Sequence, residues 1–297
     1  MRIDLAGVFP PLTTPFDRSG RLDLGAFRSN LRAYRAYSLR GYLVLGSSGE
    51  AGSVDFDERI KLIETARKEI PEGKVLLVGT GAPSLKETLK LTQVAASNGA
   101  DAALVLPPFY YKPAMTTAVM VQYYSELARA AKIPLMIYSI PQFTGIQLEV
   151  RAVTELSRKS NIIGLKESSG NLAYLAEIIE STPKRFQNVT GSALTFLPSL
   201  LAGAVGGILA VANVAPGECV EIFEDFKAGR MTLAARKQRA LLRLARALTV
   251  RFGIAGLKAG VSAAGFQGGC PRSPLRALSR PDYKAVSELY QEMRANW

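Results

Sequence analysis

A lysine in the segment NIIGLKESSG, residues 161–170, is the first candidate for chemistry. Lys166 follows a run of apolar residues and precedes an acid, two hydroxyls and a glycine. Burial at a strand end favours the uncharged amine over the ammonium form, and an amine can attack a carbonyl group to form an imine. The protonated imine then accepts electrons from a carbon–carbon bond beside the former carbonyl. The alternative interpretation is a lysine that merely ends a strand in water.

Hydroxyl groups recur in other segments that are typical of strand ends and the turns after them. Tyr138 ends the apolar run IPLMIY, two serines stand in GSSGE (46–50), two tyrosines in PPFYYKP (107–113), and Ser192 follows Gly191. A tyrosine can carry protons to and from the carbinolamine that precedes an imine. The donors of GSSG suit a substrate carboxylate, because glycines let the backbone approach closely. Taken singly, each segment also fits a packed tyrosine, a turn or a rigid loop.

The chain of 297 residues contains no histidine and only two cysteines. Mechanisms with a histidine base, a Ser-His-Asp triad or a histidine-ligated metal are therefore excluded. Two cysteines predict neither a disulfide framework nor a zinc cluster. Proton transfer near neutral pH must use tyrosine, lysine, serine, threonine or a carboxylate.

Eight short apolar runs are the strand candidates that position these residues. Most are followed by a stretch with helical spacing, which indicates parallel βαβ units and predicts a (β/α)8 TIM barrel with its chemistry at the carboxyl ends of the strands. A doubly wound sheet with a dinucleotide site is the alternative, but no G-x-G-x-x-G follows the first strand and no G-x-x-x-x-G-K-[ST] occurs. The runs are GVFPPL at 7, GYLVLG at 41, KVLLVG at 74, DAALVL at 101, IPLMIY at 133, NIIGLK at 161, FQNVTG at 186 and GGILAV at 206.

Helical patterns surround and follow the strands. Residues 57–70 and 84–100 have amphipathic spacing, and Asp55 with Glu58 forms a capping-box pattern before the first of them. Beyond about residue 215 the strand candidates stop, and we expect residues 218–252 to be helical throughout and a last helix near 281–296. We therefore predict two domains, residues 1–225 as the barrel that carries the active site and residues 226–297 as a C-terminal helical domain.

The formal net charge of +12 does not come from a basic block, because lysine and arginine are spread along the whole chain. Such a field steers small anions and argues against nucleic acid as a partner. No apolar run is long enough to span a bilayer, and the first residues lack the pattern of a signal or transit peptide. We expect a cytoplasmic protein that does not bind membranes.

Five separated motifs resemble those of one enzyme family. GSSGE, PPFYYKP, IYSIPQFTG, GLKESSGN and GAVGGILAVANV occur in the order and at spacings similar to those of the dihydrodipicolinate synthase / N-acetylneuraminate lyase superfamily of pyruvate-dependent class I aldolases. Within it, YSIP, GSALTFLPSLLAGAVGG and RFGIAGLKAGVSAAGFQGGCPRSPL look most like the 4-hydroxy-2-oxoglutarate aldolases.

The resemblance implies a role for individual residues. Lys166 falls on the imine-forming lysine, Tyr138 on the proton-relay tyrosine, and Tyr110 on a tyrosine that family members lend to the site of a neighbouring subunit. Ser47 and Ser48 fall on the hydroxyl pair that holds the carboxylate of the keto acid, with Ser47 joining the relay. Further positions that match the lining of the substrate pocket are Ser168, Gly191 and Ile208. The family assembles as a homotetramer, a dimer of dimers, and needs no metal or organic cofactor.

One position departs from the pattern of the biosynthetic synthases. They carry an arginine two residues after the proline of the Y-N-x-P segment, where it binds the carboxylate of aspartate semialdehyde, and here that position is Phe143. A phenylalanine cannot form a bidentate ion pair. We therefore expect a Schiff-base aldolase that cleaves a 4-hydroxy-2-oxo acid, with 4-hydroxy-2-oxoglutarate as the first candidate, to pyruvate and an aldehyde such as glyoxylate. The alternatives are dihydrodipicolinate synthase, a sugar-acid lyase on the same machinery, or a regulatory protein that binds keto acids without turnover.

Overall fold

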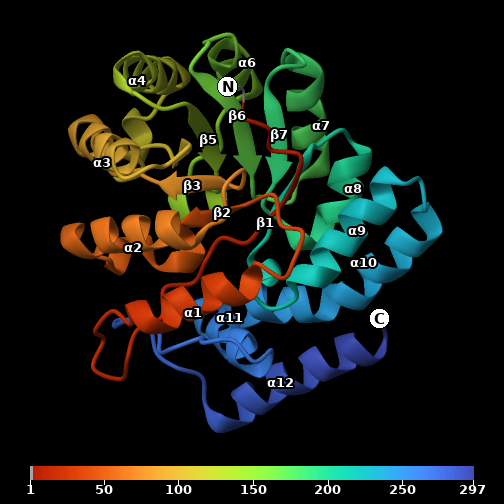
Figure 1. The fold of residues 1–297 in the computed structure, drawn as a ribbon. Coiled ribbons are helices and arrows are strands. Elements are labelled where there is room, and N and C mark those ends of the chain that lie inside the picture. Colours follow the sequence, from red (N-terminus) through yellow and green to blue (C-terminus); the bar gives the residue numbers. More distant parts are fainter. Residues whose placement is uncertain (1–2) are drawn as a thin grey trace.

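Eight parallel strands form a single sheet in the computed structural model, which describes residues 3–297 (Figure 1). Along the sheet the strands follow the order β1-β8-β7-β6-β5-β4-β3-β2, so the first and last strands of the chain are neighbours. This order confirms the predicted (β/α)8 barrel, and each of the eight apolar runs overlaps one strand. The strands are β1 (Gly7–Phe9), β2 (Gly41–Val44), β3 (Val75–Gly79), β4 (Ala102–Val105), β5 (Leu135–Ser139), β6 (Ile162–Glu167), β7 (Gln187–Thr190) and β8 (Gly206–Ile208).

The seam between β1 and β2 nearly closes the barrel. The Leu43 amide donates to the Pro10 carbonyl at 3.1 Å, and the Leu12 amide donates to the Leu43 carbonyl at 2.8 Å. Pro10 and Pro11 have no N–H to donate, so this seam has fewer ladder bonds than its neighbours. The segment 10–12 just beyond β1 therefore supplies the backbone contacts that link β1 to β2.

Helices between the strands cover the outside of the barrel (Figure 1). The predicted capping box is present before α2: the Glu58 amide donates to Asp55 Oδ1 at 2.8 Å, and the Asp55 amide donates to Glu58 Oε2 at 3.1 Å. These reciprocal bonds satisfy two amides that a helix start leaves unpaired. The helices are α1 (Leu24–Tyr34), α2 (Phe56–Glu69), α3 (Leu85–Ser97), α4 (Thr117–Ala130), α5 (Pro141–Thr144), α6 (Val150–Ser157), α7 (Leu172–Ser181) and α8 (Phe196–Leu201).

Four helices follow the last strand: α9 (Pro216–Lys227), α10 (Met231–Arg246), α11 (Gly253–Ala263) and α12 (Arg280–Ala295), with a π-helical turn at Ala247–Arg251. The expectation of uninterrupted helix over 218–252 was wrong in one place, because Gly229 takes a φ of 72° and separates α9 from α10. The last helix lies where it was predicted. In Figure 1, α10 to α12 (blue) gather along one side of the barrel beside α1.

The expected boundary between residues 225 and 226 falls within α9, two residues before its end. That helix packs against α10 and, through the Arg294–Glu218 ion pair, joins α12. In residues 3–297 no helix is long and apolar enough to cross a membrane.

The pairing of β5 with β6 determines which side chains enter the barrel. Leu135 pairs with Ile162, but the next pair is Met136 with Gly164, so one residue of β6 is skipped and the register then continues to Tyr138 opposite Lys166. Met136 and Tyr138 belong to the apolar cluster inside the barrel, whereas Ile162 packs outward against the helices. The bulge therefore turns Lys166 toward the interior, beside Tyr138.

Candidate active site

Lys166 and Tyr138 lie side by side near the carboxyl ends of β6 and β5. Both are buried, with 4% of each residue exposed. The Lys166 Nζ lies 4.2 Å from the centre of the Tyr138 ring, over its face. The negative face of an aromatic ring attracts an ammonium group. The two residues thus form a compact pair that is enclosed by the barrel.

A hydroxyl from the loop after β2 meets this pair. Ser47 Oγ lies 3.4 Å from the hydroxyl of Tyr138, and Ser47 and Ser48 begin a single 3-10 turn that ends at Gly49. Gly79 on the neighbouring strand makes room for the loop, because a Cβ there would overlap with the carbonyl oxygen of Leu45. Ser47 is therefore placed to exchange a proton with Tyr138.

Ser168 and Gly191 occupy the other flank of Lys166. Ser168 Oγ is buried, and no hydrogen-bond partner for it is found among residues 3–297. A Cβ at Gly191 would overlap with this hydroxyl and would lie 3.0 Å from Lys166 Cε, so only glycine fits. Ile208 on β8 is buried in the apolar cluster inside the barrel. Lys166 thus has a hydroxyl without a partner among the described residues close to its side chain.

The carboxylate next to Lys166 faces away from the site. Glu167 accepts hydrogen bonds from the amides of Ser169, at 2.8 Å, and Gly170, at 3.3 Å, in the loop that follows β6. Burial raises the pKa of Glu167, while these hydrogen bonds oppose the rise. Glu167 thus holds the loop after β6, next to Ser168, through these hydrogen bonds. Its carboxylate does not point into the barrel interior.

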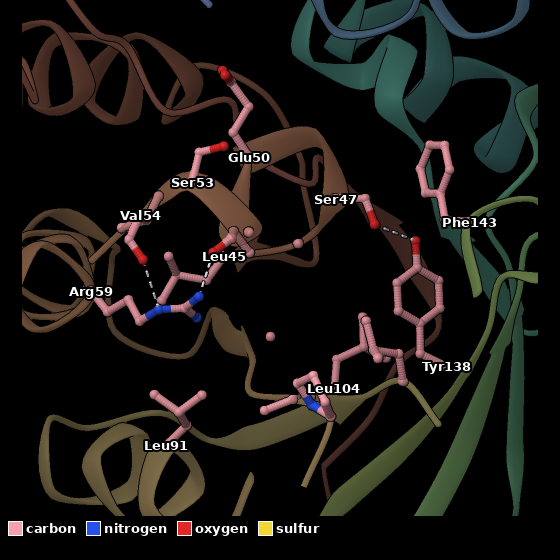
Figure 2. A pocket seen from close by; sticks show the side chains of 18 of the residues that line it. Leu45, Ser47, Glu50, Ser53, Val54, Arg59, Leu91, Leu104, Tyr138 and Phe143 are labelled. Atoms are coloured by element: carbon pink, nitrogen blue, oxygen red, sulfur yellow. Dashed lines mark hydrogen bonds between the residues drawn. The ribbon is translucent and has the colours of Figure 1, made fainter. Parts of the chain in front are cut away.

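A cavity of about 670 Å³ opens beside Ser47 and Tyr138 (Figure 2). Its lining includes Tyr138, Phe143 and Arg59 but not Lys166, whose Nζ lies over the Tyr138 ring. The Arg59 guanidinium donates to the carbonyl oxygens of Val54 and Ala51 and so braces the loop after β2. The cavity is large enough for a small organic acid next to the hydroxyls of Ser47 and Tyr138.

Phe143 lies on the one-turn helix α5 at the rim of the cavity, and 66% of it is exposed. The Gln142 side chain donates to the Ser168 carbonyl at 2.8 Å and ties α5 to the loop after β6. A large apolar side chain is therefore presented to solvent at the position where the sequence departs from the synthase pattern.

The structure does not bring Tyr110 to the lysine. Tyr110 is 73% exposed and Tyr111 is 71% exposed, and their rings pack edge to face with centres 5.0 Å apart. Neither ring lines the cavity, although Phe109 does. Within one chain, the site consists of Lys166, Tyr138 and the residues around them.

Three residues near the site had no role in the sequence-based prediction. Arg59 lines the cavity, and the carboxylate of Glu50 is paired with Lys258 of α11. A lone lysine in the apolar segment GIAGLKAGVSA is a signal for a buried, paired charge, since lysine is rarely buried without a partner. Within residues 3–297, no group of three or more cysteine, aspartate or glutamate side chains could hold a metal ion.

Comparison with known proteins agrees with this architecture. Residues 4–293 match the Dihydrodipicolinate synthetase family. A 4-hydroxy-tetrahydrodipicolinate synthase from Methanoculleus marisnigri is 34% identical over 276 residues, 92% of this chain and 94% of the relative. A probable mitochondrial 4-hydroxy-2-oxoglutarate aldolase from Emericella nidulans is 32% identical over 291 residues, 96% and 94% of the two chains.

Among solved structures, the pyruvate complex of YagE, a prophage protein of the dihydrodipicolinic acid synthase family from E. coli K12, superimposes with a TM-score of 0.91 at 27% identity, over 98% of this chain and 99% of that one. The match spans the barrel and the C-terminal helices together. The chain therefore belongs to the dihydrodipicolinate synthetase family and is an enzyme of the pyruvate-dependent class I aldolase type.

Proposed function

We propose that this enzyme cleaves a 4-hydroxy-2-oxo acid, with 4-hydroxy-2-oxoglutarate as the first candidate, into pyruvate and an aldehyde such as glyoxylate. The observation that carries the proposal is Phe143, an exposed apolar residue at the cavity rim where the biosynthetic synthases have an arginine. The similarity to the Emericella nidulans protein supports it.

The proposed reaction begins with attack of the Lys166 amine on the C2 carbonyl. Loss of water from the carbinolamine forms a protonated imine, which accepts the electron pair of the C3–C4 bond while the C4 hydroxyl loses its proton and becomes the aldehyde. Protonation of the resulting enamine at C3 and addition of water release pyruvate and the free amine. Tyr138 and Ser47 carry the protons, which their separation of 3.4 Å supports.

The remaining site residues bind substrate in this proposal. Ser47 and Ser48 hold the carboxylate of the keto acid with the hydroxyls and amides of their turn. The hydroxyl of Ser168 lacks a partner among the described residues and is available to the oxygen atoms of the cleaved half. Gly191 and Ile208 shape the wall around the lysine.

A second candidate function is that of 4-hydroxy-tetrahydrodipicolinate synthase, which the similarity to the Methanoculleus marisnigri protein favours. The same imine with pyruvate would serve it, so the two functions differ only in the aldehyde partner. A sugar-acid lyase would also share this first step. A binding protein without turnover differs from all three, because it would not release pyruvate from any 4-hydroxy-2-oxo acid.

The proposal includes the assembly and the compartment. A homotetramer, a dimer of dimers, would cover the exposed pair Tyr110 and Tyr111 and bring Tyr110 to the site of a neighbouring subunit. We also place the enzyme in the cytoplasm, which its dispersed charge and low cysteine content support.

The first prediction concerns the imine. Borohydride reduction in the presence of pyruvate should leave a covalent adduct on the peptide that contains Lys166, because reduction traps the imine. Peptide mass spectrometry would locate it. The exposed Lys112 is a matched control, and Lys112→Arg should still give the adduct whereas Lys166→Arg should not. An adduct that stays on another lysine would contradict the mechanism.

The second prediction concerns the proton relay. Tyr138→Phe keeps the ring and removes the hydroxyl, so kcat should fall by about 10²- to 10⁴-fold with little change in Tm. Tyr124→Phe is the control with the opposite pattern, since Tyr124 donates to the buried Val105 carbonyl at 2.9 Å away from the lysine. It should lower Tm and leave kcat nearly unchanged. Wild-type turnover in Tyr138→Phe would remove that residue from the mechanism.

The third prediction concerns the aldehyde. The carboxylate of aspartate semialdehyde would have no ion-pair partner at position 143, and burying it unpaired is costly, so kcat/KM with 4-hydroxy-2-oxoglutarate should exceed that for the synthase reaction at least about tenfold. Phe143→Arg should narrow the gap, and Phe143→Leu should not. Parallel assays with both substrates measure this ratio. Efficient use of aspartate semialdehyde by the wild-type enzyme would favour the second candidate, and a preference for an uncharged aldehyde would contradict both.

The fourth prediction concerns the assembly. Sedimentation at assay concentration should show at least a dimer, and Tyr110→Phe should lower kcat more than Tyr111→Phe. If Tyr110 acts across an interface, mixing Lys166→Arg subunits with Tyr110→Phe subunits should restore activity, because each mixed dimer then contains one intact site. A fully active monomer would show that the tyrosine pair has no such role.

A further inference from the structure

The turn that carries Ser47 and Ser48 lies between two residues in an unfavourable backbone conformation. Leu45 has a φ of 59° and Glu50 a φ of 54°, the only non-glycine residues of 3–297 in the left-handed region. Each such residue costs about 1–3 kcal/mol and persists only where the surrounding structure holds it. Contacts outside the turn must therefore maintain its shape.

The side chain of Glu50 makes the contacts that hold the end of the turn. Figure 2 shows it directed away from Ser47 and the cavity. Its Oε1 lies 2.5 Å from Lys258 Nζ, both side chains are 1% exposed, and its Oε2 accepts the Arg272 amide at 2.8 Å. Lys258 also donates to the Cys270 carbonyl at 2.6 Å. Two separate C-terminal segments thus converge on one carboxylate.

A buried ion pair at this place is not explained by stability alone. Removing two charges from water is costly, and apolar side chains of similar size often stabilise a protein as well or better. Burial lowers the pKa of Lys258, and the neighbouring carboxylate opposes the change. What the pair provides is direction, since the ion pair holds the Glu50 carboxylate at the position where α11 places Lys258.

We propose that Glu50 and Lys258 are positioning residues that clamp the Ser47–Ser48 turn for binding of the keto-acid carboxylate. The clamp fixes Glu50, the residue that follows the turn, to α11, so that the amides and hydroxyls of the turn and the contact of Ser47 with Tyr138 are set before substrate arrives. The C-terminal helices thereby become part of the active centre without touching substrate. This inference rests on the proposed function, because the turn binds pyruvate only in that proposal.

The test uses the full-length enzyme and the double substitution Glu50→Gln with Lys258→Met. Each single variant leaves one buried group without its partner and should lower Tm, whereas the double variant removes both charges and should recover much of that loss. The pyruvate concentration that gives half-maximal borohydride trapping on Lys166 is the readout. We expect it to rise at least tenfold in the double variant, while saturating pyruvate still labels Lys166 fully.

The control is Glu218→Gln with Arg294→Met, which removes an ion pair between α9 and α12 that does not touch the turn. The pyruvate concentration that gives half-maximal trapping in this control should equal that of the wild type. A purely structural role for Glu50 and Lys258 would change Tm but leave half-saturation unchanged in the folded double variant, and that result would overturn the clamp.

The variant Glu50→Asp, with a shorter side chain, provides the same readout if the double variant does not fold. Glu50→Asp keeps the charge, suits the left-handed backbone better, and moves the carboxylate away from Lys258. Half-saturation should rise severalfold, and an unchanged value would contradict the clamp. If the wild-type enzyme gives no adduct with pyruvate, both the proposed function and the clamp are wrong. If the wild type is trapped and the variants need the same pyruvate concentration for half-maximal trapping, only the clamp is wrong.

Discussion

The bulge between β5 and β6 is the constraint on which the site depends. Side chains alternate between the two faces of a strand, so strict pairing from Ile162 onward would have placed Lys166 on the outer face with Ile162. Skipping one residue brings Met136 opposite Gly164 and Tyr138 opposite Lys166. Gly164 allows the shift, because a Cβ there would overlap with the backbone of β7. One extra residue in a strand thus converts a lysine that would face the helices into one enclosed with a tyrosine.

Glycines also allow close backbone packing elsewhere at the carboxyl ends of the strands. Gly79 lets the Leu45 carbonyl come against β3, and Gly191 leaves space for Ser168 beside the lysine. The turn after β2 is then held from outside by Thr14, whose hydroxyl donates to the Gly49 carbonyl at 2.7 Å. It is also held through Glu50, which pairs with Lys258 of α11 and accepts the Arg272 amide of the loop that follows that helix. A strained turn can be precise only when such contacts over-determine it.

The two halves of the site have different access to water. Lys166 lies deep among Tyr138, Gly191 and the barrel core, with 4% of its surface exposed. The cavity beyond Ser47 is wide and reaches the exposed Phe143. The enclosed half suits chemistry shared across a family, and the open half suits discrimination between aldehydes, since the rim can change without disturbing the lysine.

What the sequence by itself determined is the set of local elements and their order. Apolar runs predicted all eight strands, and Asp55 with Glu58 predicted the start of α2, because periodicity and capping act over a few residues. The break at Gly229 was missed because a glycine within a helical pattern is often tolerated. The lysine, the tyrosine and the two serines could be named from their motifs. Only the tertiary structure decided the register that faces Lys166 toward Tyr138, the exposure of Tyr110, and the burial of Glu50 against Lys258 and a residue 222 positions away, Arg272. These depend on contacts between distant segments, whose geometry is set by packing of the whole barrel rather than by local preference.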